Sequence, residues 1–173
     1  MLILALVAAF LGPSALATTL STPSTLNITV IGASNNHSVL ECWALEPGFS
    51  ESATPGISGN SVIGLGQGSG AVDFALIAEH ADGGLHNAPA MQWVTFLSGS
   101  AHITLPDSED EAWVSGGKYG TILALDTQDV SAEGHYTEYP SDEVTVAITV
   151  PIAAVPGHRV LYQGPCRDTE QDY

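Results

Sequence analysis

The sequence has very little positive charge. Lys118, Arg159 and Arg167 are its only basic residues, against 19 acidic ones, so the formal net charge is −16 at pH 7. Proteins that bind nucleic acids or anionic lipids do so through clusters of Lys and Arg. The composition therefore excludes these two classes of partner. It favours a soluble protein working in an acidic extracellular medium, where protonation of carboxylates lowers the self-repulsion.

Long hydrophobic runs are also absent beyond the N-terminus. The first 17 residues, MLILALVAAFLGPSALA, are apolar but are broken by Gly12 and Pro13. They fall short of the roughly 20 apolar residues that span a bilayer, and they end in a small-x-small cleavage pattern at Ala15-Leu16-Ala17. We expect a signal peptide over residues 1–17 and a single secreted domain over residues 18–173, with no membrane attachment after cleavage. A buried N-terminal helix and a membrane anchor are the alternatives.

Cysteine is scarce, with Cys42 and Cys166 the only two. In an oxidising compartment, a lone pair far apart in the sequence favours one disulfide that joins the ends of the domain, the alternative being two buried free thiols. The N-glycosylation sequons at Asn27 and Asn36 agree with export. Their Ser-, Thr- and Asn-rich surroundings predict surface loops for both.

No stretch shows sustained helical periodicity. Short runs rich in β-branched and aromatic residues alternate with Pro, Gly, Ser and Asn, which is an all-β pattern. The acidic run Asp107–Glu111 lacks the glycine and terminal ligand of a calcium-binding EF-hand loop, so we expect a solvated hairpin loop there. Ten strands are predicted, over residues 26–31, 39–44, 61–65, 71–79, 92–97, 101–105, 121–126, 135–139, 144–150 and 160–162.

Alternation within the predicted strands indicates which face is inside. In the strand 144–150 the larger apolar side chains predict a core-facing set, and the intervening residues predict a polar or thinly covered face. The core-facing set comprises Val144, Val146, Ile148 and Val150, and the other face comprises Thr145, Ala147 and Thr149.

The strand 92–97 has no polar face. Gln92 shares one face with Val94 and Phe96, while Trp93 points the other way. Both faces need a cover, which a second sheet or a second subunit would provide. A homodimer is therefore one expectation, with Trp93 in the contact.

Residues 86–99, HNAPAMQWVTFLSG, place a histidine, a polar strand residue and a hairpin glycine at defined spacings, and Gly134-His135 closes a long loop further on. This arrangement resembles the two motifs of the cupin superfamily. More narrowly, it resembles small secreted cupin-like proteins of filamentous fungi, over about residues 61–152. Aligned on Gly99, the glutamate of the first motif corresponds to Gln92 and its first histidine to His86. The second histidine position holds Ala88.

The resemblance implies a double-stranded β-helix, the cupin jelly-roll barrel, with His86, Gln92 and His135 around one cavity as metal ligands. Glu79 or His80 could supply a missing ligand, although an exposed strand end is the simpler interpretation of both. Because an amide brings no negative charge, a divalent transition metal would be bound only weakly. The alternative for His86 and His135 is a hydrogen-bonded polar pair without metal.

The sequence contains no nucleophile elbow, zinc-protease helix or phosphate-binding loop, and no residue stands out as catalytic. We therefore expect a secreted cupin-fold protein that binds a small molecule or sugar in its cavity without chemistry. The alternative is a metal-dependent cupin enzyme, an oxidoreductase, lyase or isomerase acting on a small oxygen-rich molecule or sugar. The incomplete ligand set and the lack of an obvious general base favour the first.

Overall fold

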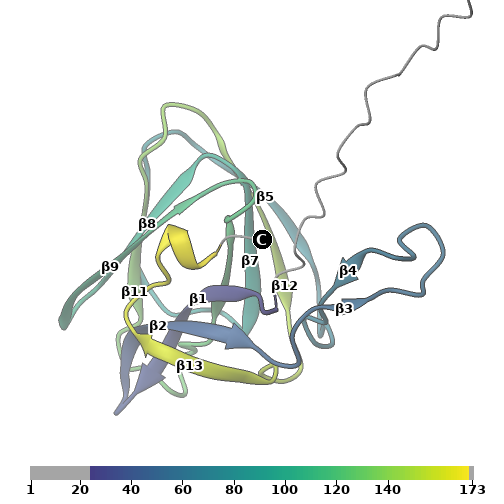
Figure 1. The fold of residues 1–173 in the computed structure, drawn as a ribbon. Coiled ribbons are helices and arrows are strands. Elements are labelled where there is room, and N and C mark those ends of the chain that lie inside the picture. Colours follow the sequence, from purple (N-terminus) through teal and green to yellow (C-terminus); the bar gives the residue numbers. More distant parts are fainter. Residues whose placement is uncertain (1–23, 172–173) are drawn as a thin grey trace, which may run out of the picture.

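The computed structural model describes residues 24–171 and shows an all-β fold (Figure 1). Its one helical element in this range is the 3-10 turn η1 (Asp168–Glu170). The all-β prediction is thus confirmed. The strands are β1 (Asn27–Ser34), β2 (His37–Leu45), β3 (Ser50–Glu51), β4 (Ser61–Val62), β5 (Asp73–Ile77), β6 (Ala81–His86), β7 (Gln92–Ser98), β8 (Ser100–Leu105), β9 (Ser108–Ser115), β10 (Thr121–Ala124), β11 (His135–Tyr139), β12 (Thr145–Pro151) and β13 (His158–Gln163).

Two sheets form the body of the fold. The larger has seven strands in the order β13-β2-β1-β10-β7-β12-β5, and the smaller has four in the order β6-β11-β8-β9. The β1–β10 pair is parallel, and the other pairs of these two sheets are antiparallel. The short strands β3 and β4 form a separate ribbon. This architecture is compatible with a β-sandwich or a jelly roll.

Each face of the larger sheet carries its own hydrophobic cluster. The inner cluster lies between the two sheets and consists of Ile31, Leu40, Ala88, Phe96, Ala101, Ile103, Leu105, Ala112, Val114, Ile122, Ala124 and Ala147. The outer cluster lies on the opposite face and consists of Ile28, Val30, Trp43, Leu45, Trp93, Leu123 and Ile152. The prediction that both faces of residues 92–97 are covered holds at Trp93 but not at the end of the strand, where Leu97 is 46% exposed. The chain itself covers Trp93, whose indole N–H donates to the Leu65 carbonyl oxygen at 2.8 Å.

The predicted inward face of the strand 144–150 is wrong. Thr145 and Ala147 are buried, at 0% and 2% exposure, whereas Val144 is 47% exposed. Thr145 packs directly against the hairpin glycine Gly99, because a Cβ at Gly99 would lie 2.2 Å from Oγ1 of Thr145. Strand alternation then places Val146 on the outward face, opposite Leu76 of the edge strand β5.

Two segments predicted as loops are strands. The acidic run begins β9, which pairs with β8 because Ala112 and Val114 supply a buried face to the inner cluster. The acidic side chains of this run stay exposed. Residues 81–86, which none of the ten predicted strands covers, form β6 and pair with β11. Alternation in β6 is hidden by Gly83 and Gly84, which have no side chains to display it.

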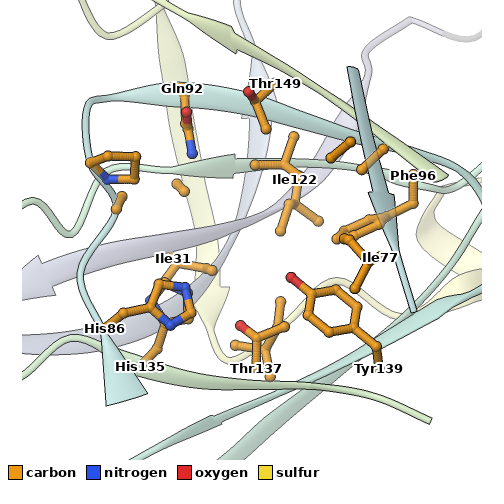
Figure 2. A pocket seen from close by; sticks show the side chains of 17 residues that line it. Ile31, Ile77, His86, Gln92, Phe96, Ile122, His135, Thr137, Tyr139 and Thr149 are labelled. Atoms are coloured by element: carbon orange, nitrogen blue, oxygen red, sulfur yellow. The ribbon is translucent and has the colours of Figure 1, made fainter. Parts of the chain in front are cut away.

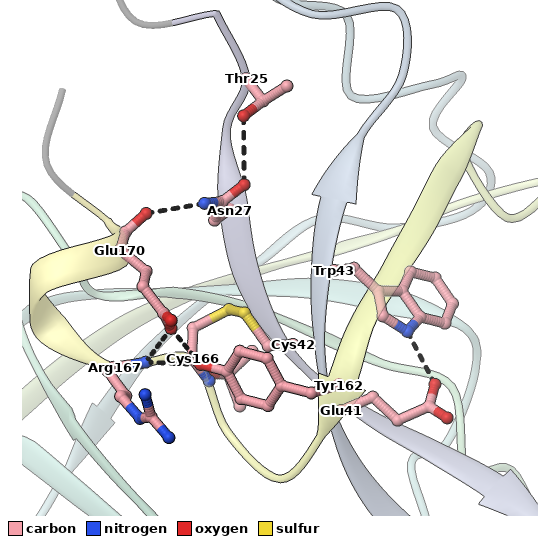
Figure 3. The surroundings of a disulfide bond; sticks show 10 residues. Thr25, Asn27, Glu41, Cys42, Trp43, Tyr162, Cys166, Arg167 and Glu170 are labelled. Carbon is pink, nitrogen blue, oxygen red and sulfur yellow. Dashed lines mark hydrogen bonds between the residues drawn. A yellow bond between two sulfur atoms is a disulfide. The ribbon is translucent and has the colours of Figure 1, made fainter.

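A disulfide joins Cys42 of β2 to Cys166, 124 residues further along, with the Cα atoms 4.6 Å apart (Figure 3). This confirms the predicted bond. The adjacent C-terminal segment is held by Asn27, whose amide donates to the Glu170 carbonyl oxygen at 2.8 Å, and by Tyr162, whose hydroxyl donates to the Glu170 carboxylate. A disulfide fits an oxidising, extracellular compartment.

The signal peptide predicted over residues 1–17 lies outside the described residues. Within residues 24–171, no helix has the length and apolar character needed to cross a membrane.

Candidate ligand-binding cavity

The pairing of β6 with β11 brings the two histidines of the predicted site together. His86 and His135 are direct cross-strand partners, and their ring centroids are 4.6 Å apart. Gly134 makes this approach possible, because it has a φ of +81° and a Cβ there would lie 2.1 Å from the His86 carbonyl oxygen. A residue with a side chain at position 134 would therefore push the two strands apart.

A cavity of about 180 Å³ lies inside the fold, with His86 and His135 on one side and Phe96 and Ile77 on the other (Figure 2). Gln92 points into the same cavity, so the structure brings the three predicted residues around one space. Ala88, at the position of the second cupin histidine, also lines it. The remaining lining residues are Ile31, Ala75, Pro89, Val94, Ile103, Ile122, Ala124, Thr137, Tyr139, Ala147 and Thr149.

His135 is anchored from behind by a buried polar network. Its Nδ1 atom lies 2.7 Å from Oδ2 of Asp126, which is fully buried. The same carboxylate oxygen accepts a hydrogen bond from the Ser38 hydroxyl at 2.7 Å, and Ser38 contacts Ser131 at 2.8 Å. Because a carboxylate oxygen only accepts, Nδ1 of His135 carries the proton. In the neutral ring the lone pair is therefore on Nε2.

The second oxygen of Asp126, Oδ1, is buried and has no hydrogen-bond partner among the described residues. A buried carboxylate with an unpartnered oxygen is costly, and such groups concentrate at functional sites. Asn87 fixes the same loop by donating to the carbonyl oxygens of Asp126 and Ser131, both at 3.0 Å. Asn87 thereby ties the residue after His86 to the network behind His135.

His86 is exposed and lies at the opening of the cavity. Its Nδ1 atom is 2.9 Å from the Gly84 carbonyl oxygen, which can only accept, so Nδ1 is the donor of this hydrogen bond. The turn is held in place by Asp82, whose side chain accepts from the Gly84 N–H at 2.8 Å. Like His135, neutral His86 therefore presents the lone pair of Nε2.

Tyr139 supplies a further polar group to a mostly apolar wall. Its hydroxyl points into the cavity, as Figure 2 shows. Burial raises the pKa of the Tyr139 phenol above its ordinary value. The hydroxyl is therefore neutral at physiological pH and can donate a hydrogen bond.

The two weaker ligand candidates do not line this cavity. Glu79 is exposed. His80 has a φ of 52° and its Nε2 lies 3.1 Å from Oδ1 of Asp142. The turn between β5 and β6 thus directs His80 to the surface. His102 also lies outside the cavity and stacks on Trp113, with ring centroids 4.0 Å apart.

The two sequons occupy different environments. Asn36 is exposed in the turn between β1 and β2, as expected of a glycosylation site. Asn27 opens β1, as the predicted strand 26–31 requires, and its amide is bound to Glu170, so it does not lie in the surface loop expected from its sequon. Glycan attachment at either position stays a prediction.

Sequence reasoning missed Asp126 and Tyr139. Asp126 follows the apolar run Ile122–Leu125, where an aspartate with no place in a turn motif is unusual, and that was the available signal. Tyr139 shares a strand face with His135 and Thr137, so alternation from His135 could have found it.

The cavity can hold a small molecule, with the two histidines on one side and further hydrogen-bonding groups, among them Gln92 and Tyr139, elsewhere on its wall. As a metal site it is incomplete: His86 and His135 offer Nε2 atoms, and Asp126 lies behind one imidazole as outer carboxylates do in metal proteins. Among the described residues, however, no group of three or more His, Cys, Asp or Glu side chains could hold an ion. The donor set fits weak binding at most.

No protein-family model, curated protein or solved structure matches the chain. The resemblance to cupins rests on the motif residues alone.

Proposed function

We propose that this protein is a secreted carrier or receptor that binds one small, mainly apolar molecule in the cavity between its sheets. The observation that supports this most strongly is the cavity itself. Its wall is largely aliphatic and aromatic, and polar groups are few, which is the usual composition of a small-molecule site.

The cavity volume limits the size of the ligand. An engineered cavity of about 150 Å³ in another protein binds benzene. At about 180 Å³, this cavity suits a molecule of one ring with a small substituent. A sugar is a poorer fit than expected from the sequence, because its many hydroxyl groups would face aliphatic side chains and lose hydrogen bonds to water.

We also propose that the fold is a cupin jelly roll and that the mature chain begins at Thr18. The positions of His86, Gln92 and His135 around one cavity support the cupin assignment. N-terminal sequencing of secreted protein tests the cleavage site, and a chain that retains Met1 would refute it.

A second candidate is a weak site for a divalent transition metal, with the enzyme activity that such a metal would allow. The facing imidazoles of His86 and His135 favour this candidate. We expect substoichiometric zinc after dialysis of the wild type and none in His135→Ala. Stoichiometric metal that survives dialysis would favour the metal-dependent enzyme over the binding protein.

Blocking the cavity tests the binding function. Ala75 and Leu76 are neighbours on β5, but Ala75 lines the cavity whereas Leu76 is 70% exposed. We expect Ala75→Phe to abolish binding of toluene, measured by calorimetry, because the ring fills the space. The matched control Leu76→Phe should bind as the wild type does. If wild-type protein binds neither toluene nor phenol, the proposed function is wrong.

A further inference from the structure

The histidine side of the cavity is built to accept hydrogen bonds. His135 donates from Nδ1 to Asp126, and His86 donates from Nδ1 to the Gly84 carbonyl oxygen. Both neutral rings are therefore left with an acceptor at Nε2. No described residue donates to either Nε2 atom, so these acceptors are available to a ligand.

This arrangement selects the polar group of the ligand. A carboxylate or phosphate would place negative charge against two lone pairs, close to the buried Asp126 carboxylate and inside a protein of net charge −16. A ketone or ether would face the histidines acceptor to acceptor, so it would have to bind the Gln92 amide or the Tyr139 hydroxyl instead and would leave both Nε2 atoms without a donor. A hydroxyl group instead donates a hydrogen bond to Nε2. This bond replaces the one that the hydroxyl loses to water when it enters the apolar cavity.

Asp126 makes His135 the stronger acceptor of the two. A carboxylate that accepts a hydrogen bond from one imidazole nitrogen strengthens the other nitrogen as a hydrogen-bond acceptor. Oδ1 of Asp126 has no partner, so its charge is poorly neutralised by the protein and acts on the His135 ring. His86, backed by a neutral carbonyl, lacks this support.

We propose that the natural ligand is a phenol, a one-ring molecule whose hydroxyl group donates a hydrogen bond to Nε2 of His135. The ring occupies the space beside Phe96 and Ile77, and Asp126 acts as a positioning residue that fixes the proton on Nδ1. This inference rests on the proposed binding function and specifies its ligand class.

Phenol and toluene form the deciding pair of probes, because they differ only by a hydroxyl group in place of a methyl group. A cavity without a positioned acceptor prefers toluene, since phenol must leave its hydrogen bonds to water. We expect the wild type, freed of metal with a chelator, to bind phenol roughly tenfold more tightly than toluene. Calorimetric or NMR titration gives both dissociation constants.

Three variants test which residues cause the preference for phenol over toluene. In His135→Leu the preference should disappear or reverse. In Asp126→Asn, where the amide can also donate to Nδ1, toluene affinity should stay constant while phenol affinity falls severalfold, an effect that a merely structural role would not produce. The control His102→Leu removes a histidine outside the cavity and should keep the tenfold ratio.

Each outcome decides one claim. Toluene binding equal to or tighter than phenol in the wild type overturns the phenol proposal and leaves cavity binding intact. A phenol preference that persists in His135→Leu overturns the role of His135. If His135→Leu does not fold, the wild-type ratio and Asp126→Asn still decide the proposal.

Discussion

The two clusters on the faces of the larger sheet are filled in different ways. Five of the twelve inner-cluster residues are alanines, and a cavity of about 180 Å³ remains beside them. The outer cluster has no alanine and is filled by the indoles of Trp43 and Trp93. Interiors pack densely unless function requires space. The comparison indicates that the outer cluster is packed densely, while the inner cluster leaves the space that the proposed binding function requires.

Removing a tryptophan from the outer cluster should have the largest effect. Trp93→Ala should lower the free energy of unfolding by about 3–5 kcal/mol, because it opens a cavity and leaves the Leu65 carbonyl oxygen without its donor. Urea denaturation measures this. Trp113→Ala is the control, because Trp113 is 61% exposed and should cost less than about 1 kcal/mol. Equal losses in the two variants would contradict the comparison.

Removing the disulfide should have the next largest effect and should not distinguish the two clusters. The double variant Cys42→Ala and Cys166→Ala should lose about 2–4 kcal/mol, because the bond closes a loop of 124 residues in the unfolded chain. The folded variant should still bind toluene in its cavity, which calorimetry measures. Loss of toluene binding in a double variant that is fully folded would show that the disulfide shapes the cavity directly.

The smallest effect concerns Tyr139 and pH. Burial raises the pKa of the Tyr139 phenol in the folded state, so the folded protein holds this proton more tightly than the unfolded chain does. The resulting stabilisation is complete below the unfolded value of about 10 and is lost as the pH rises through the raised folded value.

Denaturation curves between about pH 9 and about pH 11 check this expectation. The wild type should lose more stability over this range than Tyr139→Phe, which has no proton to release. Tyr136→Phe changes an exposed tyrosine of the same strand and should behave as the wild type does. Parallel curves for the wild type and Tyr139→Phe would show that water reaches the hydroxyl.

Local pattern predicted much of this fold and failed where partners lie far apart in the sequence. β11 was predicted over its observed range, since its buried and exposed residues alternate. β6 was missed, although it brings His86 next to His135, because its pairing depends on a strand about 50 residues away and two glycines hide its pattern. Asp126 was missed because its partner Ser38 is 88 residues away in the sequence, and because the loop that brings His135 back to it shows no regular pattern.

The inward face of β12 was wrong for a related reason. Hydrophobicity favoured Val146 for the interior, but the buried face is set by the close contact of Thr145 with Gly99 and by the cavity beside Ala147, and the pattern of one strand shows neither. Sequence thus identified three residues around the cavity and missed the carboxylate behind one of them.

β5 ends the seven-stranded sheet, and its outward side chains Phe74 and Leu76 are 63% and 70% exposed. A sheet edge offers N–H and C=O groups to any extended chain, including β5 of a second copy. β5 is therefore one of the sheet edges at which copies of this protein could pair, and the mutual repulsion of molecules with a net charge of −16 opposes such pairing. Acidification removes that repulsion without altering the edge, so the colloidal stability of this protein depends on its carboxylates.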